Sequence, residues 1–119
     1  MTTPTVFSFR EQDIAAHIAL PARTPAPAII LVHSWWGLNA HIQDVADRFA
    51  AEGFVVLAPD LFEGRTTRRG LVAKTWAGQL NRIEAVLKLQ AAIDNLLARD
   101  VVGSEQVGLV GFGMGSSYA

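Results

Sequence analysis

The chain has no cysteine and no long hydrophobic run. Without cysteine, disulfides, thiolate catalysis and cysteine-based metal sites are excluded. The net charge is only −1, so charge gives no indication of nucleic acid or an anionic membrane as a partner. The N-terminus has no basic-then-apolar signal pattern. The clearest apolar stretches, residues 28–32 and 54–58, are far shorter than a membrane span. We therefore expect a soluble, cytoplasmic protein.

What the chain does contain is enough apolar sequence for one core. Its 119 residues are 50% hydrophobic and 18% charged, which is the composition of a single folded domain rather than of a disordered segment. No linker, internal repeat or low-complexity segment divides the sequence. We expect one domain over residues 1–119.

The hydrophobic pattern predicts strands that alternate with helices. A hairpin of strands 5–9 and 14–20, with its turn at 11–13, comes before a continuous apolar strand at 28–32. Asn39 is placed to cap a helix over 40–52, and Gly53 is placed to end it. A second buried strand follows at 54–58.

After a polar loop that carries three arginines, the pattern predicts one long helix that begins at Thr75 or Gly78 and ends at Arg99. Its expected buried stripe consists of Val86, Leu89, Ile93, Leu96 and Leu97. The last strand is expected at 107–110. This order predicts an α/β fold with a mostly parallel sheet, an N-terminal antiparallel hairpin and flanking helices.

The last strand leads into the segment Gly111-Phe-Gly113-Met-Gly115. A strand, a Gly-x-nucleophile-x-Gly segment and a helix form the nucleophile elbow of α/β-hydrolases. Gly113 occupies the nucleophile position and has no side chain that could attack a carbonyl. Glycine adopts the strained elbow conformation without a Cβ penalty, so the segment predicts a tight turn with a vacant nucleophile position.

Three further segments accompany this elbow: HSWWGLN at 33–39, HIQDVADR at 41–48 and APDLF at 58–62. Together with residues 107–115 they resemble the N-terminal half of the dienelactone hydrolase family. The resemblance runs from about residue 28 to residue 119. It implies a partial α/β-hydrolase fold and an ancestry in carboxylic-ester or lactone hydrolysis.

The resemblance also implies roles for individual positions. The family nucleophile, usually cysteine, corresponds to Gly113, and a glutamate common in the family corresponds to Ser34. The oxyanion-binding backbone N–H groups correspond to Met114 and Trp35. The family's aspartate and histidine have no counterpart in the sequence. These correspondences predict a chain that is inactive in isolation.

Other side chains near these motifs have two interpretations each. Ser34 as a replacement nucleophile would need His33 or His41 as base and Asp60 as orienting acid, yet neighbouring residues 33 and 34 should point in opposite directions. Asp60 is placed either to meet a ligand at the end of a parallel strand or, more simply, to accept loop N–H groups.

Trp35 and Trp36 either line the mouth of a pocket or pack beneath a loop. The loop residues Arg65, Arg68 and Arg69 are most simply solvated, with attraction of an anionic substrate as the alternative. His17 is expected to have no chemical role.

The glycine-rich segment has two rival interpretations, and both fail. A dinucleotide fingerprint would need glycine at Ser116 and an acidic residue some twenty positions later, and a P-loop would need Gly-Lys-Ser/Thr. The sequence therefore predicts no cofactor and no metal.

The strand at 107–110 is central in a complete α/β-hydrolase sheet, but here it would be an edge with open N–H and C=O groups. We expect a homodimer, or a second chain that completes the fold, and a small-molecule ester or anion as ligand. The alternative function is a non-catalytic binding or assembly module that dimerises through this edge.

Overall fold

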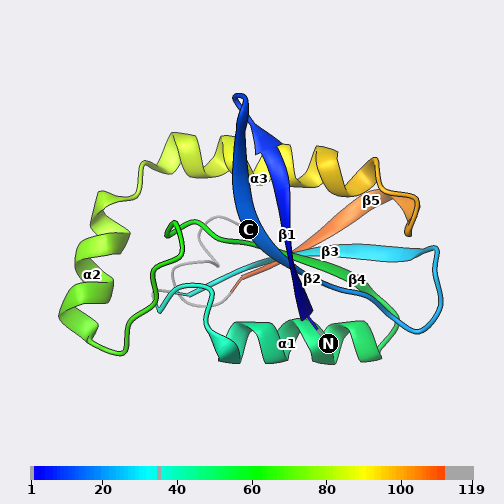
Figure 1. The fold of residues 1–119 in the computed structure, drawn as a ribbon, viewed down its shortest axis with the longest axis horizontal. Helices are drawn as coiled ribbons and strands as arrows, with labels where there is room; N and C mark the ends of the chain where they lie inside the picture. The colour runs from blue at the N-terminus through cyan, green and yellow to red at the C-terminus, as the bar shows by residue number, and fades with distance from the viewer. Residues whose placement is uncertain (1, 35, 112–119) are drawn as a thin grey trace.

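The computed structural model describes residues 2–34 and 36–111, which form a five-stranded sheet between helices (Figure 1). The strands are β1 (Thr2–Phe9), β2 (Gln12–Ala19), β3 (Ala26–Val32), β4 (Val55–Pro59) and β5 (Val102–Gly111). The helices are α1 (Ala40–Ala51), α2 (Gly70–Gln79) and α3 (Arg82–Leu97). The strand order across the sheet is β1-β2-β4-β3-β5.

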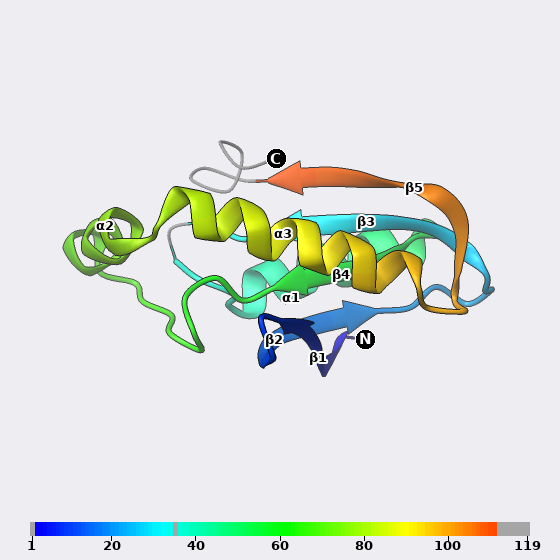
Figure 2. The same ribbon diagram turned by 90° about the horizontal axis from the view of Figure 1, so that it is seen from above.

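Strand directions agree with the expected α/β class. β3 pairs in parallel with both β4 and β5, whereas β2 pairs antiparallel with β1 and β4. α1 and α3 lie on opposite faces of the sheet, as both Figure 1 and Figure 2 show. The α/β class, the N-terminal antiparallel hairpin and the helices on both faces are as predicted. The sheet is mixed rather than mostly parallel, with two parallel and two antiparallel strand pairings.

The N-terminal hairpin turns one residue earlier than the sequence pattern indicated. Arg10 and Glu11 form the turn with φ of 49° and 64°, and Gln12 and Asp13 already belong to β2. Positive φ at both positions is characteristic of the type I′ two-residue loop, whose twist matches that of the flanking strands. The predicted turn at residues 11–13 is therefore wrong by one position.

β3 and β5 both begin earlier than predicted. β3 starts at Ala26 rather than Ala28, and β5 starts at Val102 rather than Val107. The pairing of Ala26 with Val102, followed by a register irregularity before Ala28, extends the two strands together. The glycine at 103, which was expected to precede the strand, lies inside it.

The predicted long second helix is two helices. Leu80 and Asn81 have extended backbone (ψ 121° and 115°), and the side chain of Asn81 accepts a hydrogen bond from the N–H of Glu84. Asn81 therefore acts as the N-cap of α3. The segment from Gly70, expected to be part of the loop, forms α2, which stands apart from the sheet in Figure 1.

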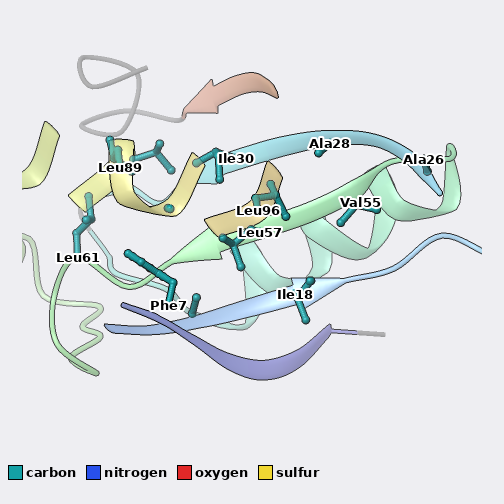
Figure 3. Close-up of a cluster of buried hydrophobic side chains, with 13 residues drawn as sticks. Phe7, Ile18, Ala26, Ala28, Ile30, Val55, Leu57, Leu61, Leu89 and Leu96 are labelled. Carbon is teal, nitrogen blue, oxygen red and sulfur yellow. The ribbon is translucent and has the colours of Figure 1, made fainter. Parts of the chain in front are cut away.

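α3 rests on the sheet through Ala85, Leu89, Ala92 and Leu96. Leu89 and Leu96 point toward Ile30 of β3 and Leu57 of β4 in Figure 3. Val86, predicted to be buried, is 53% exposed. The two alanines allow α3 to approach the sheet closely, so the larger apolar side chains beside them lie on the flank of the helix.

On the opposite face, Ile42, Ala46 and Ala50 of α1 pack against Leu31 and Val56. The side chain of Asn39 accepts a hydrogen bond from the N–H of Ile42 at 3.1 Å, as expected for the N-cap. Among the described residues, no helix has the length and apolar character needed to span a membrane.

Candidate active site at the carboxyl ends of the parallel strands

The parallel strands β3, β4 and β5 all end at the same edge of the sheet, which is where ligands bind in open α/β folds. His33 and Ser34 follow β3, and Asp60 follows β4. The structure therefore brings three of the predicted site residues to this edge. Trp35, Gly113 and Met114 lie outside the described residues. So do Ser116 and Ser117, which the sequence pattern assigns to the first turn of a terminal helix as cap or solvated residues, with a role as nucleophile as the alternative.

His33 is fully buried and bonded to backbone through both ring nitrogens. The N–H of Leu61 donates to Nε2 at 3.0 Å, and Nδ1 lies 2.8 Å from the carbonyl oxygen of Ser34. A carbonyl can only accept, so Nδ1 carries the proton and Nε2 is the acceptor. The ring is thus neutral and connects the end of β3 to the loop after β4.

The surroundings of His33 favour this neutral form. Burial lowers its pKa below the usual 6.5, against smaller opposing effects of the Ser34 hydrogen bond and the charge of Asp60. The ring of Phe62 packs edge-on against it, with centroids 4.9 Å apart. These contacts make His33 a structural residue of the site rather than a base for Ser34.

Asp60 organises the loop that follows β4. One carboxylate oxygen accepts from the N–H of Phe62 at 3.0 Å, and the other accepts from the N–H of Gly64 at 2.8 Å. The simpler of its two interpretations therefore holds, because the side chain satisfies backbone donors two and four residues ahead, as Asp commonly does in turns. Both carboxylate oxygens of Asp60 are thereby bonded to backbone N–H groups, as are both ring nitrogens of His33 to backbone atoms.

Ser34 and Trp36 belong to a tight turn after β3. The carbonyl oxygen of Ser34 accepts from the N–H of Gly37 at 3.1 Å, and that of Trp36 accepts from the N–H of Thr67 at 3.2 Å. Gly37 has φ +85°, and a Cβ there would collide with the carbonyl oxygen of Arg65. This close approach locks the two loops together and requires glycine.

Trp36 is 38% exposed, so its neighbours cover more than half of its surface. The two interpretations of Trp36, at the mouth of a pocket or packed beneath a loop, stay predictions.

The loop after β4 and helix α2 add aromatic contacts that sequence reasoning missed. Phe62 is buried and packs edge-on against Trp76 of α2 at 5.9 Å. The Arg65 guanidinium lies over the Trp76 ring at 4.7 Å, and its Nε donates to the carbonyl oxygen of Phe62 at 3.0 Å. Arg65 is exposed, as expected, and its guanidinium also connects α2 to the loop after β4.

A signal for this contact was present in the sequence. Trp76 is the one aromatic residue of α2, but the pattern assigned it to a longer helix whose buried stripe excluded it.

A cavity of about 140 Å³ opens beside these residues, toward Asn81, Glu84 and Lys88 at the start of α3. No group of acidic, histidine or cysteine side chains suited to a metal ion occurs among the described residues.

The described part of the site positions backbone groups, but it assembles no nucleophile with a base. Ser34 accepts a hydrogen bond from His33 through its backbone carbonyl oxygen, not through its hydroxyl group. The other ring nitrogen of His33 accepts from the N–H of Leu61. A catalytic pair needs nucleophile and base side chains within hydrogen-bond reach.

A family model described as "Dienelactone hydrolase family" matches residues 14–119. Protein usf of Aquifex pyrophilus is 31% identical over 114 residues, which is 89% of this chain and 48% of that protein. Carboxymethylenebutenolidase of Pseudomonas putida is 26% identical and matches 97% of this chain and 52% of that protein.

Among solved structures, the one titled "m3DLH" superposes with a TM-score of 0.86 at 22% identity. It covers 100% of this chain, which spans 52% of that structure. The chain thus spans about half the length of the curated relatives it matches. With the family model matching nearly the whole sequence and the same fold in the solved structure, this chain belongs to the dienelactone hydrolase family.

Proposed function

We propose that this chain carries the first half of a carboxylic-ester or lactone hydrolase and does not turn over esters by itself. The observation that carries the proposal is the bonding of His33. Both of its nitrogens are held by backbone groups at the edge where the family's chemistry takes place. Gly113, at the position that corresponds to the nucleophile, adds a second reason.

Ester hydrolysis of this kind needs three elements at one place. A nucleophile attacks the carbonyl carbon, a base takes the nucleophile's proton, and backbone N–H groups stabilise the oxyanion that forms. Gly37, after β3, lies so close to the carbonyl oxygen of Arg65 that a Cβ would not fit between them, so the two loops pack directly against each other. This packing supports a preorganised oxyanion-binding N–H, which the resemblance assigns to Trp35.

The names of the relatives support a substrate class. Carboxymethylenebutenolidase of Pseudomonas putida bears the name of an enzyme that acts on a lactone. We infer that the ancestral substrate of this chain was a small ester or lactone. Trp36, exposed beside the site, would contact the apolar part of such a molecule.

A chromogenic ester assay tests this proposal. Purified chain should release p-nitrophenol from p-nitrophenyl acetate no faster than buffer does. Multiple-turnover hydrolysis that is lost in Ser34→Ala or in Ser116→Ala would show that a serine had taken over as nucleophile, and the proposal would be wrong.

Restoring the missing nucleophile gives a sharper result. Gly113→Cys should be acylated once per chain and faster than Leu71→Cys, a control in exposed α2. The elbow cysteine would lie next to the oxyanion-binding N–H groups, whereas position 71 has none. Equal acylation rates at the two positions would contradict an elbow at residue 113.

The alternative function is a non-catalytic assembly module that dimerises through its sheet edge. It is favoured by one observation: in the described part of the chain, β5 pairs with β3 alone. A stable dimer that shows no esterase activity, either as the wild type or as Gly113→Cys, would support it.

A further inference from the structure

The cavity of about 140 Å³ lies between the loop after β4, the end of α2 and the first turns of α3. These segments meet at one end of the molecule in Figure 1. The residues that line the cavity include Phe62 and Trp76, but not His33, Ser34 or Asp60. The cavity is therefore distinct from the candidate active site, although the ring of Phe62 contacts that of His33.

The inner wall of the cavity is apolar. It is formed by Leu61 and Phe62, which are buried, and by Trp76 and Leu80, which are partly buried. An apolar cavity of about 150 Å³ is large enough to hold a molecule the size of benzene. The cavity therefore has room for a branched aliphatic group of roughly four or five carbon atoms.

Charged side chains of both signs border the same cavity. They are Glu63 and Arg65 of the loop after β4, and Glu84 and Lys88 of α3. Lys88 and Glu84 are one helical turn apart and form an ion pair at 3.5 Å, in which the Lys88 side chain is only 11% exposed. The two charges of α3 thus neutralise each other within the helix.

The two charges of the loop do not neutralise each other. Nε of Arg65 donates to the carbonyl oxygen of Phe62, and the guanidinium lies over the ring of Trp76. Within residues 2–34 and 36–111, neither Glu63 nor the terminal nitrogens of Arg65 take part in an ion pair. One cation and one anion at this cavity therefore stay available to a ligand.

The backbone at Glu63 is a further indication of a binding site. Its φ is 54°, which lies in the left-handed region that residues with a side chain adopt uncommonly. Strained backbone of this kind is concentrated at ligand-binding and active sites. Here the strained residue is itself one of the two available charges.

We propose that this cavity binds a small zwitterion without net charge, an apolar α-amino acid of about the size of leucine. Its carboxylate accepts from the terminal nitrogens of Arg65, its ammonium group donates to the carboxylate of Glu63, and its side chain enters the apolar part. An anion without the ammonium group would meet Glu63 uncompensated, and an amine without the carboxylate would meet Arg65 in the same way. This inference goes beyond the proposed function, because it involves no ester chemistry.

Titration of the isotope-labelled chain with L-leucine, followed by NMR at the Trp76 indole N–H and the Gly64 backbone N–H, tests the proposal. The matched ligands are isocaproate, which is leucine without its ammonium group, and isoamylamine, which is leucine without its carboxylate. We expect saturable shifts with L-leucine and an affinity about tenfold higher, or more, than for either matched ligand. The reason is that each matched ligand leaves one charged side chain of the cavity without a partner.

A charge-removing variant identifies the residue that recognises the ammonium group. Glu63→Gln keeps the shape of the side chain and should abolish the preference for L-leucine over isocaproate. The matched control is Glu11→Gln, because Glu11 also has a positive φ, 64°, but does not line the cavity. This control should keep the preference unchanged.

Three outcomes would overturn the proposal. The first is the absence of saturable shifts at Trp76 and Gly64 with L-leucine. The second is isocaproate or isoamylamine binding as tightly as L-leucine, since the cavity would then recognise a single charge. The third is a Glu63→Gln variant that still prefers L-leucine over isocaproate. Since none of these measurements involves ester hydrolysis, they stand or fall separately from the proposed function.

Discussion

Replacement of His33 by phenylalanine tests whether this histidine is structural. The ring of phenylalanine fills similar space but offers no acceptor to the N–H of Leu61, which His33 accepts at 3.0 Å in a buried position. A buried donor left without a partner costs about 1–3 kcal/mol. The carbonyl oxygen of Ser34 loses one donor but still accepts from the N–H of Gly37 at 3.1 Å. The loss at Ser34 therefore adds little to the destabilisation.

The expected loss is therefore about 1–3 kcal/mol of unfolding free energy. Since unfolding entropy is about 2.1 cal/mol/K per residue, this chain should melt about 4–12 °C lower. Thermal unfolding followed by circular dichroism measures the shift. His41→Phe, at an exposed position of α1, is the control and should change the midpoint little.

A His33→Phe variant that unfolds with the stability of the wild type would refute this reasoning. It would mean that the Leu61 N–H finds water or another acceptor at no cost. His33→Gln, whose amide oxygen can accept the same N–H, should lose less stability than His33→Phe.

The pH dependence of stability gives an independent check on the same residue. Burial lowers the pKa of His33 in the folded state, so below the unfolded value of about 6.5 the unfolded chain binds a proton that the folded chain does not. His33 therefore costs stability as pH falls below about 6.5 and has no pH effect above it. The stability difference between wild type and His33→Gln, measured by urea unfolding, should shrink from pH 7.5 to pH 5; a constant difference would contradict the assignment.

Three other changes probe the scaffold by urea unfolding. Gly37→Ala should destabilise by more than Gly53→Ala: both positions have positive φ, but only position 37 lacks space for a Cβ, and equal losses would contradict the close approach of the two loops. Asn81→Ala should cost about 0.5–2 kcal/mol because it removes the cap of α3, and no loss would mean that the cap adds nothing. Leu96→Ala should cost about 2–5 kcal/mol, because it removes a buried side chain of α3. Leu71 is 81% exposed, so Leu71→Ala should change the unfolding free energy by no more than about 0.5 kcal/mol. Similar losses in the two variants would show that α3 is not packed as described.

Local sequence determined the elements whose signals are contained in a few neighbouring residues. The apolar runs that became β3 and β4, and the helix that Asn39 caps and Gly53 ends, could be predicted because each depends on its own side chains and backbone. Family membership could also be predicted, because the segments around Ser34, Asp60 and Gly113 occur together along the chain in the order found in the family.

Tertiary structure decided which of several equivalent residues faces the core. Val86 and Ala85 are neighbours in α3, and hydrophobicity favours valine, yet alanine faces the sheet because a small side chain lets the helix approach. The structural role of His33 could likewise not be predicted from the sequence, because its hydrogen-bond partner Leu61 lies 28 residues away along the chain. Contacts of this kind arise only when strands and loops distant in sequence meet, and no local pattern carries them.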